Sequence, residues 1–321
     1  MIVVDKKGKS KSELIRGLHN IRDRHRGNVV TLGSFDGVHL GHQHVINHLI
    51  DKSNEYGVPS VVVIFEPQPL EFLAPERAPA RLMRFREKVN ALFDAGVDRV
   101  FCLHFDQYLS ALSAEDFCRK VLIDGLGTKY LVVGDDFRFG HDRKGDFEFL
   151  CCQGELFDFG VSDTKTHQHS GERVSSTRIR GCLAKGDVEE AGKLLGRPYS
   201  MSGRVVYGNQ IGRKLGVPTA NVGLRRHRTP LSGVFAVKVK LPNSAECFGV
   251  ANVGVRPSVD GIAKPILEVH LFDFSGNLYG SRIDVEFCQK IRDEKKFESL
   301  DILKENIESD IACAKRIFNL S

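Results

Sequence analysis

One stretch near the amino terminus, residues 29–49, constrains the fold more than any other, because its pattern changes abruptly along the chain. It opens with Val29, Val30 and Leu32, an apolar and β-branched run that predicts a short buried strand. Two glycines follow and permit a sharp reversal of the backbone. Apolar residues at helical spacing then predict a helix that begins near His42. Strand, glycine turn and helix in this order are typical of an α/β sheet.

The turn carries two histidines, His39 and His42, separated by Leu40 and Gly41. In an α/β sheet such a turn lies at the carboxyl edge of the strands, where the amides of a helix N-terminus favour an anion. Each imidazole can donate a hydrogen bond to a phosphoryl oxygen, and Gly41 leaves room for a phosphate or ribose. Surface histidines placed by chance, or a metal site built from the histidines of this segment, are the alternatives. No cysteine or carboxylate completes a recognisable metal-ligand set with them.

The segment GSFDGVHLGH resembles the signature of the HxGH nucleotidyltransferase superfamily. More narrowly, it is similar to the FMN adenylyltransferase module of bacterial bifunctional riboflavin kinase/FAD synthetases. The resemblance implies that His39 and His42 stabilise the transition state of adenylyl transfer from ATP to FMN. It also implies further ATP contacts in the same segment, at Gly33, Phe35, Asp36 and Gly41.

The length of 321 residues allows two domains with ordinary cores. The sequence has no apolar run of about 18 residues that could span a bilayer and no signal peptide, so we expect a cytoplasmic protein without membrane association. The eight cysteines include one vicinal pair and no CxxC, which predicts reduced, buried thiols and argues against a disulfide framework or a zinc site. A formal charge of +5 favours small anionic ligands such as nucleotides and does not require a nucleic acid.

The rest of the first half alternates between predicted strands and helices. We expect an initial helix over residues 12–21, strands over 60–65, 100–105 and 130–133, and helices near 84–94 and 114–123. This alternation predicts a mostly parallel sheet that is covered by helices on both faces.

Two polar loops follow strands of this sheet. Residues 65–69 include two prolines and predict a rigid pocket wall, although an ordinary turn fits nearly as well. Residues 134–140 combine two aspartates, two phenylalanines and an arginine between glycines. We interpret this second loop as a binding loop, because adenylyl transfer to an already ionised phosphate needs no general base. The predicted flavin contacts from the two loops are Phe65, Pro67, Asp136 and Arg138.

Residues 173–180 contain serines and a threonine in positions that predict a capped helix, whose amides and arginines would face phosphate oxygens. An ordinary capped surface helix is the alternative. The adenylyltransferase family uses this SSTxxR segment on the ATP triphosphate, which implies ATP contacts at Arg173, Ser176, Thr177 and Arg180. The helix continues further, with breaks at Gly186 and Gly196. We therefore expect a nucleotidyltransferase domain over residues 1–186 and a second domain over residues 187–321.

The second half changes to short β-rich segments that are separated by turn residues. Strands are predicted over residues 234–241, 247–252, 266–274 and 283–287. Their close spacing predicts an antiparallel barrel or sandwich. An amphipathic pattern over residues 297–318 predicts a packing helix at the end of the chain.

A glycine-rich loop within residues 203–221 matches neither the Walker A pattern nor the GxGxxG fingerprint. Its Thr219 and Asn221 supply oxygen ligands that suit Mg²⁺, although a lone PTAN segment is more often a turn. Preceded by GxxxGRxLG, the segment resembles the riboflavin kinase signature, with Val217 where that family usually has phenylalanine. The resemblance implies that Thr219 and Asn221 hold Mg²⁺. It implies ATP contacts at Gly208, Gly212, Arg213, Gly216, Pro218, Thr219 and Asn221.

Glu268 interrupts the apolar strand predicted over residues 266–274. A carboxylate there is costly unless it is exposed or functional, so a surface-facing side chain is the alternative to a site residue. The riboflavin kinase resemblance implies that Glu268 is the general base that accepts the proton of the ribityl 5′-hydroxyl. Residues 252–257 likewise resemble the NxGxRP loop of that family, whereas the basic run 225–228 is predicted to be a solvated loop.

Both halves thus resemble one two-domain family. The resemblance implies a Rossmann-like HxGH nucleotidyltransferase domain, followed by an antiparallel β-barrel riboflavin kinase domain with a terminal helix. The implied activities are phosphorylation of riboflavin to FMN and adenylylation of FMN to FAD, with Mg²⁺ as cofactor and ATP, riboflavin and FMN as substrates. An RNA-binding or tRNA-related protein is the alternative, but the sequence has no KMSKS-like loop and no concentrated basic face beyond residues 225–228. Small-molecule substrates and no nucleic acid are expected, and the oligomeric state stays open.

Overall fold

The computed structural model describes residues 12–208, 212, 215–256 and 264–320. The chain folds as two compact units: the first contains residues up to Ala78 and Phe85–Val174, and the second contains Pro79–Arg84 and Ser175–Ser321. Each unit has its own sheet and its own hydrophobic core. No helix in the described part of the chain is both long enough and apolar enough to cross a bilayer.

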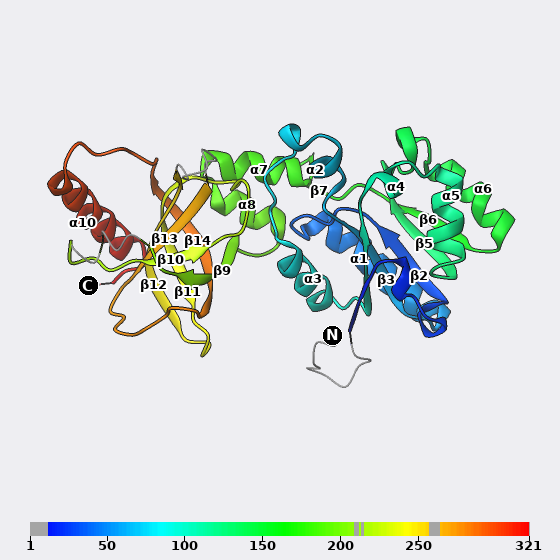
Figure 1. Ribbon diagram of the computed structural model, residues 1–321, viewed down its shortest axis with the longest axis horizontal. Coiled ribbons are helices and arrows are strands. Elements are labelled where there is room, and N and C mark those ends of the chain that lie inside the picture. Colours follow the sequence, from blue (N-terminus) through cyan, green and yellow to red (C-terminus); the bar gives the residue numbers. More distant parts are fainter. Residues whose placement is uncertain (1–11, 209–211, 213–214, 257–263, 321) are drawn as a thin grey trace. The chain divides into compact units, whose positions relative to one another are not determined.

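A parallel sheet of six strands runs through the described part of the first unit (Figure 1). Its strand order is β1-β4-β3-β2-β5-β6. Its strands are β1 (Glu13–Arg16), β2 (Asn28–Leu32), β3 (Ser60–Glu66), β4 (Arg99–His104), β5 (Thr128–Gly134) and β6 (Gly160–Thr164). The parallel sheet predicted from the alternating pattern is confirmed. β2, which precedes the glycine turn, lies in the interior of the sheet between β3 and β5.

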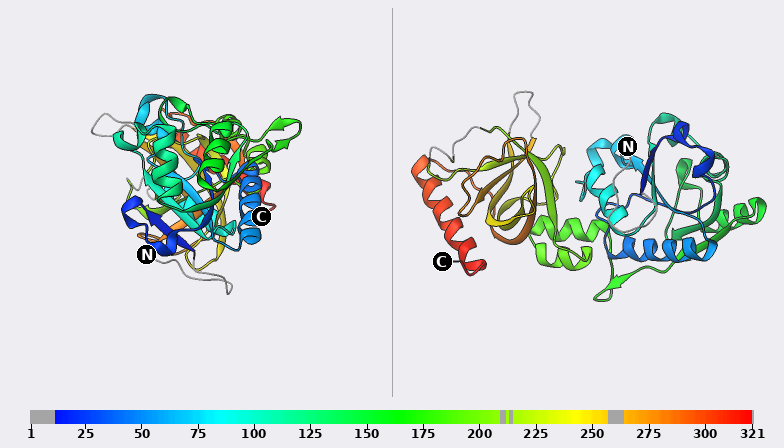
Figure 2. Two further views of the ribbon diagram at one scale, coloured as in Figure 1. Left: turned by 90° about the vertical axis from the view of Figure 1, so that its right-hand side faces the viewer. Right: turned by 90° about the horizontal axis from the view of Figure 1, so that it is seen from below.

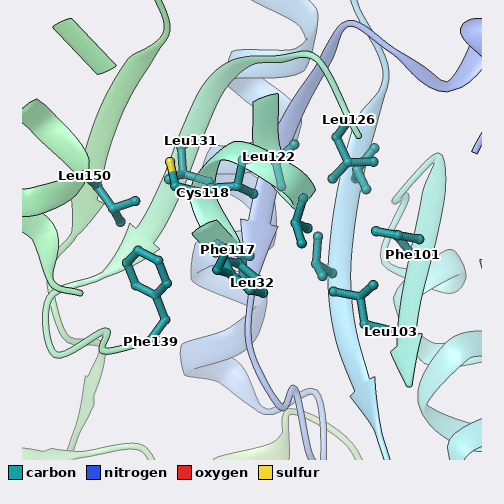
Figure 3. Close-up of a cluster of buried hydrophobic side chains, with 14 of the residues drawn as sticks. Leu32, Phe101, Leu103, Phe117, Cys118, Leu122, Leu126, Leu131, Phe139 and Leu150 are labelled. Atoms are coloured by element: carbon teal, nitrogen blue, oxygen red, sulfur yellow. The ribbon is translucent and has the colours of Figure 1, made fainter. Parts of the chain in front are cut away.

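Helices cover both faces of this sheet. α1 (Leu40–Tyr56) packs along β2 and β5, and α3 (Phe85–Asp94) packs against β4. The opposite face holds a large apolar cluster, shown in Figure 3, in which Leu32 and Phe101 of the sheet meet Phe117, Leu122 and Leu150. Those three residues belong to α5 (Ala114–Phe117), a π-helical turn η4 (Cys118–Ile123) and α6 (Phe147–Phe157). The remaining helices and strands of this unit are short: α2 (Pro69–Leu73), α4 (Gln107–Ser110), β7 (Gln168–His169) and β8 (Glu172–Arg173).

The helix predicted over residues 12–21 is wrong. Glu13–Arg16 forms the edge strand β1, which pairs in parallel with β4, and a 3-10 turn over Leu18–Asn20 follows. The apolar spacing fits a helix, but Ile15 is the residue of this segment that lies deep in the core, at 3% exposed. Gly17, with a φ of 73°, ends the extended backbone. Sheet hydrogen bonds to β4 therefore override a weak helical pattern.

The second unit contains a closed antiparallel barrel, with the strand order β10-β13-β12-β11-β14-β9 among the described residues. This result decides between the barrel and the sandwich that the sequence left open. The strands are β9 (Ser200–Val206), β10 (Ala220–Gly223), β11 (Gly233–Lys240), β12 (Glu246–Arg256), β13 (Lys264–Leu271) and β14 (Arg282–Arg292). β9 and β10 were not predicted, because glycine and polar residues dilute their β pattern.

Three longer helices accompany the barrel: α7 (Ser176–Lys185), α8 (Val188–Leu195) and α10 (Leu300–Ile317). The predicted breaks are confirmed, since Gly186 and Gly196 end α7 and α8 in the left-handed conformation. The predicted terminal helix is also confirmed, and α10 lies against the outside of the barrel (Figure 2). A bidentate ion pair between Arg292 of β14 and Asp310 of α10, with nitrogen–oxygen distances of 2.9 and 2.7 Å, joins the two elements.

The segment Pro79–Arg84, which we call the strap, comes from the first half of the sequence but packs within the second unit. Leu82 is fully buried there. Arg226 donates to the carbonyl oxygens of Arg81 and Leu82 at 2.7 and 3.2 Å, and Arg84 donates to the carbonyl of Leu224 at 3.1 Å. The prediction that residues 225–228 form a solvated basic loop is therefore wrong for Arg226, because its side chain is enclosed and serves as an anchor.

All eight cysteines lie in the described residues and are free thiols. Burial raises the pKa of Cys102 to about 11 and that of Cys118 to about 12. Cys102 and Cys118 are buried, five cysteines are partly buried and Cys152 is exposed, so the prediction of buried thiols is wrong for most of the cysteines.

Candidate active sites

The loop after β2 combines burial with an unusual backbone. Phe35 and Val38 have positive φ angles of 45° and 41°, and Gly37 between them has a φ of 92°. Positive φ is uncommon outside glycine and is especially unfavourable for a β-branched valine. Phe35, Asp36 and Val38 are nonetheless almost completely buried. Such a conformation persists only where the surrounding structure holds it, and strain of this kind concentrates at functional sites.

His39 and His42 lie at the start of α1, immediately after this loop. His39 caps the helix, because its Nδ1 accepts a hydrogen bond from the backbone N–H of His42 at 3.3 Å. The helix therefore begins at Leu40, two residues earlier than predicted. The two rings stack with their centroids 3.6 Å apart. Since Nδ1 accepts, a neutral His39 carries its proton on Nε2, which can donate to an anion.

The glycines of the turn make close packing possible. A Cβ atom on Gly41 would lie 3.2 Å from the His39 ring and 3.3 Å from the carbonyl oxygen of Val174. A Cβ on Gly33 would lie 3.1 Å from the ring of Phe35. Gly41 is thus surrounded closely by other atoms of the protein. The sequence analysis explained this glycine by the room it leaves for a ligand and did not reveal this packing. Within the described residues, no group of three or more His, Cys, Asp and Glu side chains is suited to a metal ion.

The second polar loop is linked to the segment before α7. Asp136 forms an ion pair with Arg173 at 2.6 Å, so a predicted flavin contact meets a predicted ATP contact. Arg138 instead pairs with Asp146, the N-cap residue of α6, at 2.6 Å. The pKa of Asp146 is lowered by the backbone N–H of Phe149 and by Arg138. Arg138 therefore has a structural partner, and its contact with flavin stays a prediction.

Phe65 and Pro67 are both half-buried at the end of β3. The Phe65 ring meets that of Phe105 edge to face, with the centroids 5.9 Å apart, at the border of the apolar cluster. Ser175 caps α7 by accepting from the backbone N–H of Arg178, which confirms the predicted capped helix. The predicted ATP contacts Ser176, Thr177 and Arg180 lie on this helix. They belong to the second unit, where Arg180 donates to the carbonyl of Ala80 at 2.7 Å.

In the second unit, two glycines pack directly against the two predicted magnesium ligands. A Cβ atom on Gly208 would collide with the carboxamide of Asn221, which would have to move to make room for it. A Cβ on Gly212 would lie 3.3 Å from the hydroxyl of Thr219 and would collide with the carbonyl of Val217. The predicted ATP contacts Gly216 and Pro218 are exposed in the same turn, with a φ of 80° at Gly216, and Arg213 lies outside the described residues.

Glu268 lies in a row of polar residues that crosses three strands of the barrel. It is the direct partner of Asn221 in β10 and of Asn252 in β12. Direct cross-strand partners point to the same face of a sheet. Leu267 and Val269, on either side of Glu268, are almost fully buried, so the row lies on the outer face of the barrel.

Two cavities meet at Thr219. The smaller, of 210 Å³, is lined by Thr219, Asn252 and Glu268 on the barrel and by apolar residues of α10. The larger, of 650 Å³, is lined by Thr219, Pro218 and the pair Tyr207 and Tyr279, whose rings stack 4.1 Å apart. The outward-facing Glu268 is thus a wall of a cavity, unlike an ordinary surface carboxylate.

Sequence reasoning missed several polar residues of the smaller cavity, among them His270 and Arg292. His270 donates from Nδ1 to the carbonyl of Pro218 at 2.9 Å, and so connects β13 to the turn before Thr219. Its position two residues after Glu268 in a strand was a usable signal, because alternate strand residues share a face. Arg292 also lines the cavity, but its role depends on Asp310 of α10, which no local pattern indicates.

Comparison with known proteins gives a consistent result for both halves. Residues 21–178 match the family model described as FAD synthetase, and residues 195–318 match the model described as riboflavin kinase. A bifunctional riboflavin kinase/FMN adenylyltransferase from Pseudomonas fluorescens is 52% identical, across 95% of this chain and 97% of that protein. Its counterpart from Escherichia coli K12 is 46% identical, across 96% of this chain and 99% of that protein. The RNA-binding alternative finds no support in these matches.

A solved structure from Streptococcus pneumoniae also resembles the chain. It is 33% identical with a TM-score of 0.78, and the match covers 92% of this chain and 97% of that one. That protein is described as a macrolide-efflux protein, a name that differs from those of the sequence relatives.

Proposed function

This chain belongs to the bifunctional riboflavin kinase/FMN adenylyltransferase family, and on that premise we propose that it makes FAD from riboflavin in two steps. In the first step ATP phosphorylates riboflavin to FMN. In the second step ATP adenylylates FMN to FAD and pyrophosphate is released. We assign adenylyl transfer to residues 1–186 and the kinase step to residues 187–321. The cytoplasmic location expected from the sequence stays a prediction.

The observation that carries the kinase assignment is the position of Thr219 between two cavities. We assign the adenosine of ATP to the larger cavity, where stacked tyrosines offer an aromatic surface, and riboflavin to the smaller cavity beside Glu268. With this placement, the phosphoryl group passes the hydroxyl of Thr219 on its way to riboflavin. Positioning of the two substrates accounts for much of phosphoryl-transfer catalysis.

Glu268 is the proposed general base of the kinase step. It accepts the proton of the ribityl 5′-hydroxyl, while the hydroxyl oxygen forms a bond to the γ-phosphorus and the bond to the β-phosphate oxygen breaks. Thr219 and Asn221 fit a magnesium ion, since both offer oxygen ligands and the adjacent Gly208 and Gly212 leave no side chain beside them. Magnesium bound with ATP supplies neutralisation of phosphate charge.

The adenylyl step needs no general base, because the phosphate of FMN is already ionised. One of its oxygens forms a bond to the α-phosphorus of ATP, and the bond to the pyrophosphate oxygen breaks. His39 donates from Nε2 to a phosphoryl oxygen, and His42 lies stacked on it in position to do the same. Charge that develops on these oxygens in the transition state is thereby stabilised.

A single experiment tests both steps. The purified chain is incubated with riboflavin, ATP and magnesium, and the flavins are separated by chromatography. FMN should appear first and FAD should follow as FMN accumulates. Absence of both FMN and FAD rejects the kinase assignment, and failure to convert supplied FMN to FAD rejects the adenylyltransferase assignment.

A further inference from the structure

Lys88 of α3 is a fully buried lysine that the two proposed reactions do not use. Lysine is almost never fully buried unless it is paired, because removing an ammonium group from water is costly. Its Nζ donates a hydrogen bond of 2.6 Å to the backbone carbonyl of Ser34. Ser34 is the second residue of the strained loop of residues 33–38, which leads from β2 to the two histidines.

The strained loop is held by side chains at both of its ends. Lys88 holds the carbonyl of Ser34. The next residue, Phe35, is the first residue of the loop with a positive φ. At the other end, Nε2 of Gln43 in α1 donates to the carbonyl of Val38 at 2.9 Å. Backbone with φ angles of this kind is retained only when neighbouring groups determine it. Two helices therefore fix the loop from opposite ends.

Other observations place the Lys88 charge at the carboxyl edge of the sheet. The charge acts on Cys102 in β4. Burial, and to a smaller extent Glu66, raise the pKa of Cys102 to about 11, whereas the charges of Arg16 and Lys88 act in the opposite direction. Glu66 ends β3 at this same edge, where the loop after β2 also begins. A buried cation thus lies beneath a loop to which we assign an anionic substrate.

We propose that Lys88 is a positioning residue for adenylyl transfer, which holds the loop of residues 33–38 in the one conformation that presents its amides and His39 to ATP. Gln43 has the same role at the other end of the loop, through its hydrogen bond to the carbonyl of Val38. This inference rests on the proposed adenylyltransferase function. Lys88 acts through the loop and does not touch the reacting atoms.

The test uses the full chain and the substitution Lys88→Met, which keeps most of the packing volume and removes the charge and the hydrogen bond. For FAD formation from FMN and ATP, KM for ATP should rise and kcat/KM should fall about 10- to 100-fold, because small displacements of positioning groups have effects of this size. Hydrogen exchange of the amides of residues 34–38, followed by mass spectrometry, should become faster. FMN formation from riboflavin should not change.

Arg99→Met is the matched control. Arg99 is also a largely buried cation, but it begins β4 and donates to Asn28 and to the carbonyl of Arg24 at the amino edge of the sheet. Its loss should destabilise the first unit without changing KM for ATP or the exchange of residues 34–38. An equal effect of Arg99→Met and Lys88→Met on KM and on exchange means a general structural role and overturns the proposal.

Gln43→Leu is the second variant, for use if Lys88→Met does not fold. It removes the hydrogen bond to the carbonyl of Val38 and leaves the buried charge of Lys88 in place. Like Lys88→Met, it should raise KM for ATP and speed the hydrogen exchange of the amides of residues 34–38. The expected change is about fivefold, which corresponds to the loss of one neutral hydrogen bond. Wild-type kinetics and exchange in Lys88→Met, or in Gln43→Leu if the lysine variant cannot be obtained, overturn the inference. The wild-type chain is assayed in parallel, and its failure to form FAD rejects the proposed function itself.

Discussion

At the scale of single residues, Glu268 has the most specific proposed role. Its neighbours Leu267 and Val269 face the barrel interior, while Glu268 lies between Asn221 and Asn252 on the outer face and lines the small cavity. The 5′-hydroxyl of riboflavin is a poor nucleophile while it keeps its proton. A carboxylate in this position should raise the transfer rate by about 10² to 10⁴.

We expect Glu268→Gln to slow riboflavin phosphorylation by that factor, about 3 to 5 kcal/mol of barrier. The amide keeps the size of the side chain but cannot accept the proton. Initial rates of FMN formation measure the effect, and FAD formation from supplied FMN should stay near wild type. Glu286→Gln is the control, since Glu286 also lies between two buried strand residues and faces outward, on β14. Normal kinase turnover in Glu268→Gln would falsify its role as the base.

At the scale of elements, the strap Pro79–Arg84 completes the second unit. Leu82 is fully buried, and Tyr199 and Arg226 both donate to its carbonyl oxygen, at 3.3 and 3.2 Å. A buried leucine that is truncated to alanine leaves a cavity, which costs stability beyond the lost transfer free energy. The kinase half of the sequence therefore depends on a segment from the other half.

Leu82→Ala should lower the free energy of unfolding of the second unit by about 2 to 5 kcal/mol. Scanning calorimetry of the full chain measures the change. Leu73→Ala serves as the control, because Leu73 is 60% exposed and its loss should change stability by less than about 0.5 kcal/mol. If both variants melt like the wild type, the strap does not stabilise the second unit.

At the scale of the whole molecule, the two reactions should be separable. The histidines follow β2 in the first unit, whereas Thr219, Asn221 and Glu268 lie on the barrel of the second unit. We therefore expect the double substitution His39→Ala and His42→Ala to abolish FAD formation and to leave riboflavin phosphorylation intact.

Chromatographic assays with riboflavin and with FMN as separate substrates measure the two activities of this double variant. The pair His44→Ala and His48→Ala, on the same helix, is the control for a general effect of histidine removal. Loss of both activities in a folded His39 and His42 variant would instead indicate one composite site.

The sequence by itself determined the features that depend on local pattern. The strand, glycine turn and helix of residues 29–49 could be predicted, because a β-branched run and helical spacing report nearby burial. The breaks at Gly186 and Gly196 could be predicted for a similar reason, since their backbone conformation suits glycine. The family motifs allowed the candidate residues of both sites to be named.

Only the tertiary structure decided which distant segments meet. Residues 13–16 are a strand because β4 lies beside them, and Arg226 is buried because the strap, more than 140 positions away in sequence, supplies its acceptors. The row that places Glu268 between two asparagines exists only in the register of the barrel strands. Lys88 gives no local sign that its charge is buried under the loop of Ser34. Local periodicity reports which side of an element is apolar, whereas pairing and burial depend on contacts between residues that are far apart in the chain.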